Sequence, residues 1–388
     1  MGAVLLIMVV GLLFLTACGA SSADPTTLPT PAVPVGSNTV APAVTSTVAV
    51  APAQPATAIP PTPLATLPQD ATPAPAVSVG RPTVSSAHPP TQPASGPGGQ
   101  EYLYKNITSK RYGQGEEAYY IFEPVQPAPT KALPVIAFLH GYLGVDPDRD
   151  GYAAWINHLV RRGNLVIFPV YQAQDSRDGT RYTDNALAAL KAAFQRLQDG
   201  SHARPDLANF LAVGYSAGGV IATNLAARAE KNGLPVPKAL FAVTPGGCAN
   251  CSILAIRNFT LDSQAELAAI PATTKILILV GEQDVVVGRS AGNLIWQNTP
   301  QVPAANKNYL LFHTDNYGTP PLVADHGMAT QQPPNTLNYN GIWKLSDGLE
   351  SCTFEAKSCE VALGNTPKQR SLGQWSDGTP VKELTVLG

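Results

Sequence analysis

The sequence predicts an α/β fold in which a mainly parallel, twisted sheet has helices on both faces. From Glu116 onward, apolar runs of strand length alternate with amphipathic helical patterns. These runs are nearly continuous instead of alternating with polar residues, which is typical of strands that are buried on both faces. Such strands are joined by right-handed crossovers, and the sheet binds its ligands at the carboxyl ends of the strands.

The predicted elements follow one another in a regular order. The strands lie at residues 134–139, 165–170, 210–213, 239–243, 275–280 and 308–312. The helices lie at residues 152–162, 185–197 and 220–228. In the first helix, the spacing of Trp155, Leu159 and Val160 places all three on the inward face.

The first hundred residues have a different composition. Of the 37 Pro residues in this 388-residue chain, 18 lie between Ser21 and Gln100. The same stretch has no aromatic residue, and its charged side chains are Asp24, Asp70 and Arg81. It cannot bury enough apolar surface to offset the entropy cost of ordering its backbone. We therefore expect residues 18–100 to form a disordered Pro/Thr/Ala-rich tether and residues 101–388 to form one folded domain.

The charge balance excludes two classes of partner. The chain has 25 Lys+Arg and 27 Asp+Glu residues, so its formal net charge is −2. Binding of nucleic acid, or of an anionic membrane through a polybasic segment, needs a cluster of cations that this composition does not supply.

A short apolar run at residues 3–15 leads into Leu15-Thr16-Ala17-Cys18. The run is too short to span a bilayer, which takes roughly 20 residues. Its end resembles the bacterial lipoprotein signal, in which small residues precede a lipidated Cys. The resemblance implies that residues 1–17 are removed, that Cys18 is lipidated, and that the protein is exported and anchored on the outer face of a bacterial membrane or at the cell surface. No Lys or Arg precedes the run, although the n-region of such a signal normally has one. The alternative is an ordinary signal peptide in which the Cys is incidental.

Four further Cys residues suit an oxidising compartment. We favour the local disulfides Cys248–Cys251 and Cys352–Cys359 among the three connectivities that four Cys allow. A zinc site made of four thiolates is an alternative, although the second pair is spaced more widely than usual. A redox-active pair at Cys248 and Cys251 is a further alternative.

The motif Gly214-Tyr215-Ser216-Ala217-Gly218 follows the strand at 210–213 and precedes the helix at 220–228. In this strand–turn–helix context it is the G-x-S-x-G nucleophile elbow. The glycines allow a strained turn that lifts the hydroxyl of Ser216 above the sheet. The N–H of Ala217, at the start of the helix, is then placed to stabilise an oxyanion.

Three more segments match the α/β-hydrolase superfamily, which this chain resembles over residues 116–350. The first is His140-Gly141-Tyr142, which resembles the H-G-x loop that supplies the second oxyanion donor, here the N–H of Tyr142. The second is Gly281-Glu282-Gln283-Asp284, and the third is Asp325-His326-Gly327. The resemblance implies an α/β-hydrolase fold with a catalytic triad, in which Ser216 is the nucleophile, His326 the base and Asp284 the acid that orients the base.

Other residues compete for these roles. His313 is an alternative base, and Asp315 and Asp325 are alternative acids. We expect His140 to order the oxyanion loop. We expect His158 and His202 to be ordinary helix and loop residues.

The loops around the elbow are too short for a large helical lid. We expect an open cleft whose substrate-binding residues are Tyr142, Leu143, Tyr215 and Val286. In these features the chain is similar to cutinase-like, chlorophyllase-like and dienelactone-hydrolase-like esterases. The expected function is hydrolysis of small or polymeric carboxylic esters by a monomer that needs no cofactor. A serine peptidase or amidase, an acyltransferase and a non-catalytic binding module are the alternatives.

Residues 146–151 begin like a calcium-binding loop, because Asp146, Asp148 and Asp150 alternate before a Gly. The twelfth position is Asn157 where such a loop has a bidentate Glu. We therefore keep two interpretations, a calcium site that stiffens the oxyanion loop and a plain surface turn.

Overall fold

The computed structural model describes residues 86–252 and 254–388. The expected signal peptide, the lipidation site Cys18 and most of the expected tether lie outside the described residues.

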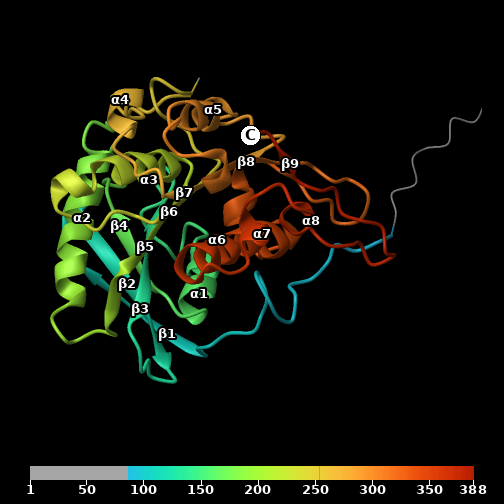
Figure 1. The fold of residues 1–388 in the computed structure, drawn as a ribbon, viewed down its shortest axis with the longest axis horizontal. Coiled ribbons are helices and arrows are strands. Elements are labelled where there is room, and N and C mark those ends of the chain that lie inside the picture. Colours follow the sequence, from blue (N-terminus) through green and yellow to red (C-terminus); the bar gives the residue numbers. More distant parts are fainter. Residues whose placement is uncertain (1–85, 253) are drawn as a thin grey trace, which may run out of the picture. The chain divides into compact units, whose positions relative to one another are not determined.

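The described residues form a mixed α/β fold around a nine-stranded, mostly parallel sheet (Figure 1), which confirms the predicted fold class at this level. The strands are β1 Asn106–Tyr112, β2 Ala118–Gln126, β3 Leu133–Leu139, β4 Leu165–Val170, β5 Pro205–Tyr215, β6 Ala239–Val243, β7 Lys275–Gly281, β8 Lys307–Phe312 and β9 Thr385–Val386. The α-helices are α1 Ala153–Arg161, α2 Tyr182–Leu197, α3 Ala217–Arg228, α4 Gln264–Leu267, α5 Ser290–Gln297, α6 Lys344–Glu355, α7 Cys359–Ala362 and α8 Pro367–Arg370. A π-helix, η5 Leu337–Trp343, leads directly into α6.

The strand order is β1-β2-β4-β3-β5-β6-β7-β8-β9. The pairs β1–β2, β2–β4 and β8–β9 are antiparallel, and the other neighbouring strands are parallel. The chain passes from β3 to β4 on one side and then returns to place β5 on the other side of β3. This reversal is a topological switch point, where open α/β sheets bind their ligands at the carboxyl ends of the strands. A ligand-binding site is therefore expected at the segments that follow β3 and β5.

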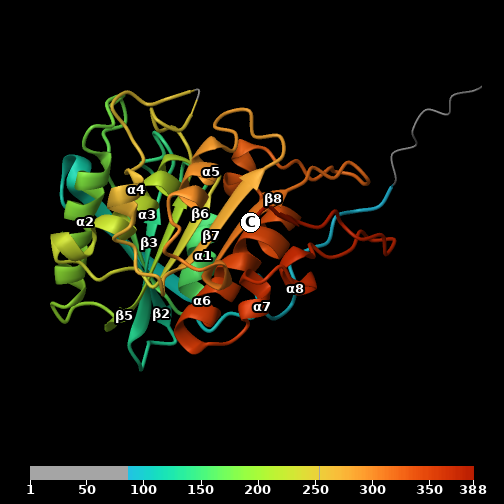
Figure 2. The same ribbon diagram turned by 45° about the horizontal axis from the view of Figure 1, so that its top comes forward.

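Alternate residues of the central strands enter two separate cores. On β3, Val135, Ala137 and Leu139 pack with α2 and α3, whereas Ile136 and Phe138 pack with α1 and α6. Figures 1 and 2 show the same division, with α2 and α3 on one face of the sheet and α1 and α6 on the other. Burial on both faces explains why the strands read as continuous apolar runs.

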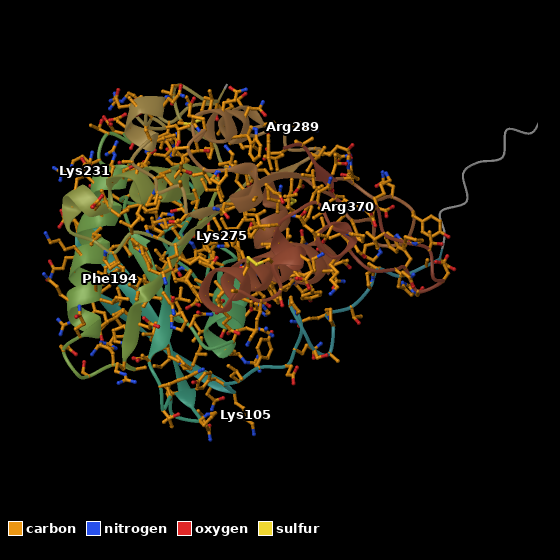
Figure 3. The ribbon with its side chains drawn as sticks, in the orientation of Figure 1. Lys105, Phe194, Lys231, Lys275, Arg289 and Arg370 are labelled. Atoms are coloured by element: carbon orange, nitrogen blue, oxygen red, sulfur yellow. A yellow bond between two sulfur atoms is a disulfide. The ribbon has the colours of Figure 1, made fainter. Side chains whose placement is uncertain are left out.

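Most charged side chains lie at the periphery of the molecule, and apolar side chains of the helices face the sheet. In Figure 3 the side chains of Lys105 and Lys231 lie at the edge of the molecule, and both are exposed. Phe194, by contrast, lies on the inner face of α2, where its ring packs edge-on against Phe210 with 5.2 Å between the ring centroids.

Residues 86–100, which the sequence analysis placed in the tether, pack against the domain. The N–H of Gly98 donates to Asp347 of α6 at 2.7 Å, and Thr336 donates to the carbonyl of Pro90 at 2.7 Å. Ala87 is buried. A segment without aromatic residues has no core of its own, but it can still order itself by hydrogen bonding to a core that others supply. The folded part therefore begins before residue 101.

The tail beyond Ser351 also packs on this domain. Trp375 is buried, and its indole N–H donates to Asp315 at 3.1 Å. Strand β9 extends the sheet beside β8. The structure pairs Cys352 with Cys359, which joins the end of α6 to α7.

Among the residues described, no helix has both the length and the apolar character that crossing a membrane requires.

Candidate active site

The turn between β5 and α3 holds Ser216 in a strained conformation, with φ 56° and ψ −122°. Glycine is required on both sides of this turn. A Cβ on Gly214 would collide with the carbonyl oxygen of Gly218, and a Cβ on Gly218 would collide with the carbonyl oxygen of Leu139 on β3. The elbow motif therefore places Ser216 close to the end of β3, at the switch point of the sheet.

Three side chains from different strand ends form one hydrogen-bonded array. The Oγ of Ser216 lies 3.0 Å from Nε2 of His326, and Nδ1 of His326 lies 2.8 Å from Oδ2 of Asp284. Asp284 follows β7, and His326 follows β8 after a longer loop. The residues predicted as nucleophile, base and acid are thus brought together in the order that a triad requires.

The second oxygen of Asp284 fixes the carboxylate in place. Its Oδ1 accepts hydrogen bonds from the N–H groups of Val286 and Val287, each at 3.0 Å. Burial raises the pKa of Asp284, but hydrogen bonds from His326 and these two N–H groups outweigh it, so that the pKa lies below its ordinary value. The carboxylate is therefore ionised at neutral pH, and it can hold His326 with Nδ1 protonated and Nε2 facing Ser216.

The position of His326 is also fixed from its backbone. The hydroxyl of Tyr215 donates to the carbonyl of His326 at 2.9 Å, and the two rings lie 5.3 Å apart. Tyr215 is buried, and it faces the α1 side of the sheet.

Two backbone N–H groups remain as donors for an oxyanion. Among the described residues, the N–H groups of Tyr142 and Ala217 have no acceptor. The loop that presents Tyr142 is fixed on both sides, because Gly141 donates to the hydroxyl of Tyr152 at 2.9 Å and Leu143 donates to Gln172 at 3.1 Å. These contacts preorganise the predicted donors beside Ser216.

His140 has a supporting position under this loop. It is fully buried, its ring stacks on Tyr171 at 4.0 Å, and its Nδ1 donates to the carbonyl of Gly141 at 2.6 Å. Burial lowers the pKa of His140 to about 4, so the ring is neutral. These contacts agree with the expectation that His140 orders the oxyanion loop.

A cavity of about 620 Å³ opens beside Ser216. Its lining residues are Tyr142, Arg177, Ser216, Gly247, Leu254, Ala255, Ile256, Arg257, Val286 and Val287. Two of the predicted substrate-binding residues, Tyr142 and Val286, are in this lining. The other two, Leu143 and Tyr215, lie outside this lining, and their role in binding substrate stays a prediction. Tyr215, the last residue of β5, packs in the core on the α1 side of the sheet, whereas Ser216 on the strained turn that follows lines the cavity.

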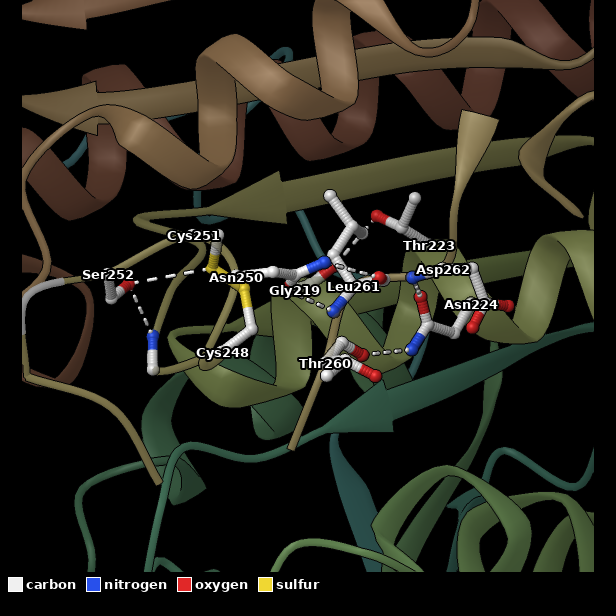
Figure 4. The surroundings of a disulfide bond; sticks show 11 residues. Gly219, Thr223, Asn224, Cys248, Asn250, Cys251, Ser252, Thr260, Leu261 and Asp262 are labelled. Carbon is white, nitrogen blue, oxygen red and sulfur yellow. Dashed lines mark hydrogen bonds between the residues drawn. A yellow bond between two sulfur atoms is a disulfide. The ribbon is translucent and has the colours of Figure 1, made fainter. Parts of the chain in front are cut away.

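Half of the cavity wall comes from a segment that the sequence analysis did not assign to the site. The loop after β6 is described over residues 244–252 and 254–262, and in it Cys248 and Cys251 are paired. Figure 4 shows how this loop is fastened. Asn250 exchanges hydrogen bonds with the backbone of Leu261, and Asn224 of α3 binds the backbone on either side, at Thr260 and Asp262. The Cys pair was a visible signal, since the two residues are three positions apart. The contacts of the two Asn residues were not, because they join residues 11 to 38 positions apart in the sequence.

The carboxylates of Asp146 and Asp150, for which the sequence leaves both a calcium site and a surface turn open, have hydrogen-bonding partners within their own loop. One carboxylate oxygen of Asp146 accepts the N–H groups of Asp148 and Arg149, and the carboxylate of Asp150 accepts the N–H of Asp146 and the guanidinium of Arg149. In the part of the chain that is described, no three carboxylate, imidazole or thiol groups are close enough together to hold a metal ion. The hydrogen bonds are those of a surface turn, and the calcium site stays a prediction.

The competing residues have other partners. His313 bonds Glu282 and Thr385, and Asp315 accepts from Trp375 and from the backbone of Lys382. His158 lies in α1 and His202 in the loop before β5, as expected, and each of them contacts a carboxylate. His158 is buried against Asp347 at 3.1 Å, and Nδ1 of His202 lies 2.9 Å from Glu123. Helical spacing could place His158 on a buried face, but its partner is 189 residues away in the sequence.

Comparison with known proteins does not assign the chain to a family. No family model matches it, and no curated protein matches its sequence.

Proposed function

We propose that this protein is a serine hydrolase with an α/β-hydrolase fold, and that it cleaves carboxylic esters through an acyl-enzyme intermediate. The observation that carries the proposal is the array from Ser216 through His326 to Asp284, which lies on a strained elbow beside two unpaired N–H donors. The strand order, with its switch point at this site, supports the same fold assignment.

The geometry supports the following sequence of steps. His326 removes the proton of Ser216 as the Oγ attacks the ester carbonyl, and the N–H groups of Tyr142 and Ala217 stabilise the oxyanion of the tetrahedral intermediate. The C–O bond to the alcohol then breaks, and the imidazolium of His326 returns the proton to the leaving oxygen. Water, activated by His326, attacks the acyl-enzyme and releases the acid and free Ser216. Asp284 stays ionised and stabilises the imidazolium throughout.

The proposed location follows from the N-terminal motif. We propose that the domain is exported and is held at a bacterial membrane or cell surface by a lipid on Cys18, with the Pro-rich segment as a spacer. Paired cysteines in the domain agree with an oxidising compartment.

Hydrolysis of 4-nitrophenyl esters tests the activity. We expect the wild type to release 4-nitrophenolate from acetyl to hexanoyl esters, and Ser216→Ala to lose this activity by at least about a thousandfold. Ser109→Ala, which changes an exposed serine on β1, is the matched control. Equal rates for wild type and Ser216→Ala would contradict the proposal. A 4-nitroanilide cleaved faster than the matching ester would favour the amidase alternative.

A further inference from the structure

The charges at the cavity beside Ser216 are unbalanced. Its lining includes two arginines, Arg177 and Arg257, and no Asp or Glu. The remaining wall is apolar apart from Ser216 and the hydroxyl of Tyr142. A cavity of this kind suits a molecule that has an apolar body and carries negative charge.

The two arginines differ in their ion-pair partners. Arg257 donates to Asp178 at 3.0 Å. Asp178 is in turn held by Asn258 and Thr180, so this ion pair belongs to the loop structure. Arg177 has no hydrogen bond or ion pair with any of the described residues. Its guanidinium is exposed and is the cation of the lining that no carboxylate balances.

The apolar wall indicates which part of a substrate would lie between its ester group and its negative charge. Leu254, Ile256, Val286 and Val287 form much of it, and Leu254 and Val286 are among the exposed large apolar side chains. A compact cavity of about 620 Å³ is roughly 10 Å across, which suits a chain of about four to eight carbons or one aromatic ring.

We propose that the preferred substrates are esters that bear a carboxylate, and that Arg177 is a specificity-determining residue that binds this carboxylate. The guanidinium is a fork of N–H donors that matches a carboxylate in shape and charge. This inference rests on the proposed ester hydrolase function. The carboxylate can belong either to the acyl part, as in the monoester of a dicarboxylic acid, or to the alcohol part.

Matched ester pairs test the proposal with the full exported chain. In the acyl pair, mono-4-nitrophenyl adipate is compared with 4-nitrophenyl hexanoate. In the alcohol pair, 4-hexanoyloxybenzoate is compared with phenyl hexanoate. The measured quantity is the ratio of kcat/KM for the anionic ester to kcat/KM for the neutral ester of the same pair, which cancels any general loss of activity.

We expect Arg177→Gln to lower this ratio about tenfold in at least one pair, because a charge-assisted hydrogen bond at a solvent-accessible site is lost. Arg177→Lys should retain part of the ratio, since it keeps the charge but not the fork. Raising the ionic strength should lower the wild-type ratio as well. The control is Arg111→Gln, which removes an exposed arginine on β1 outside the cavity.

The outcomes separate this inference from the proposed function. A ratio that stays within twofold of wild type in both pairs for Arg177→Gln, while the neutral esters are hydrolysed, overturns the inference alone. Absence of hydrolysis of all four esters by the wild type contradicts the proposed function itself. Which pair responds identifies the part of the substrate that carries the charge.

Discussion

Replacing Asp284 with Asn isolates the electrostatic contribution of the triad acid. Asn has nearly the same shape, and its carbonyl oxygen can still accept the N–H groups of Val286 and Val287, which bond Oδ1 of Asp284 at 3.0 Å. The amide NH₂ then faces Nδ1 of His326. This favours the tautomer that has the proton on Nε2, and such a ring cannot accept the proton of Ser216.

The structure sets the size of the effect. Oδ2 of Asp284 and Nδ1 of His326 are 2.8 Å apart, and at an effective dielectric constant of about 20 a pair of unit charges at that distance attracts by about 6 kcal/mol. The side chain of Asp284 is fully buried, but that of His326 is 16% exposed, so solvent screens part of this attraction. We therefore expect kcat to fall by about 10³- to 10⁴-fold.

Release of 4-nitrophenolate from 4-nitrophenyl hexanoate, measured from pH 6 to 10, is the assay. The control is Asp325→Asn, which removes the carboxylate adjacent to His326 in sequence, and which should keep kcat within a few-fold of wild type. Thermal unfolding of both variants checks that the fold is retained. A loss in Asp284→Asn of less than tenfold would refute the assignment of Asp284 as the orienting acid.

Two further predictions concern stability. Gly218→Ala places a methyl group against the carbonyl oxygens of Leu139 and His140, so we expect a loss of at least about 2 kcal/mol in the free energy of unfolding. The control is Gly327→Ala, whose new Cβ has its nearest contact, with Asp325, at 3.6 Å. Equal melting temperatures for Gly218→Ala and Gly327→Ala would contradict the predicted clash. Burial, followed by the charge of Asp347, raises the pKa of Glu350 to about 8 from 4.5. The folded protein then holds a proton that the unfolded chain has lost within this window, so stability falls as pH rises from about 4.5 to 8. Glu350→Gln should remove this dependence and be more stable than wild type by on the order of 4 kcal/mol at pH 8, as measured by urea unfolding. Glu230→Gln, which removes an exposed carboxylate elsewhere, should follow wild type. Parallel pH curves for Glu350→Gln and wild type would contradict the prediction.

The central sheet was predictable because strands that are buried on both faces are continuous apolar runs in the sequence. The predicted strand at 165–170 and the predicted strand at 239–243 have the bounds of β4 and β6. The antiparallel strands β1 and β2 were not predicted. β1 is the edge strand and is largely exposed, whereas β2 is mostly buried between β1 and β4. Their pairing, like that of β9 with β8, depends on partners and not on local apolar periodicity.

The same distinction applies to the site. The positions of Ser216, Asp284 and His326 were predictable, because each residue lies in a short motif that comes after a predicted strand. The wall of the cavity could not be predicted, because the loop after β6 has no regular apolar periodicity. Its path depends on one disulfide and on the side chains of Asn224 and Asn250. Likewise, the order of residues 86–100 depends on contacts with α6 and the loop before it. Local composition cannot express such contacts.

Labelling with a fluorophosphonate probe tests whether Ser216 is an activated nucleophile, because the probe phosphonylates a serine only where a base activates it and an oxyanion site binds the phosphoryl oxygen of the probe. Mass spectrometry of the digested protein then identifies the modified residue. We expect one label on Ser216 of the wild type, none on Ser216→Ala, and slow labelling of Asp284→Asn. Labelling of Ser216→Ala to the same extent as wild type, or an unlabelled wild type that is folded, would contradict this expectation.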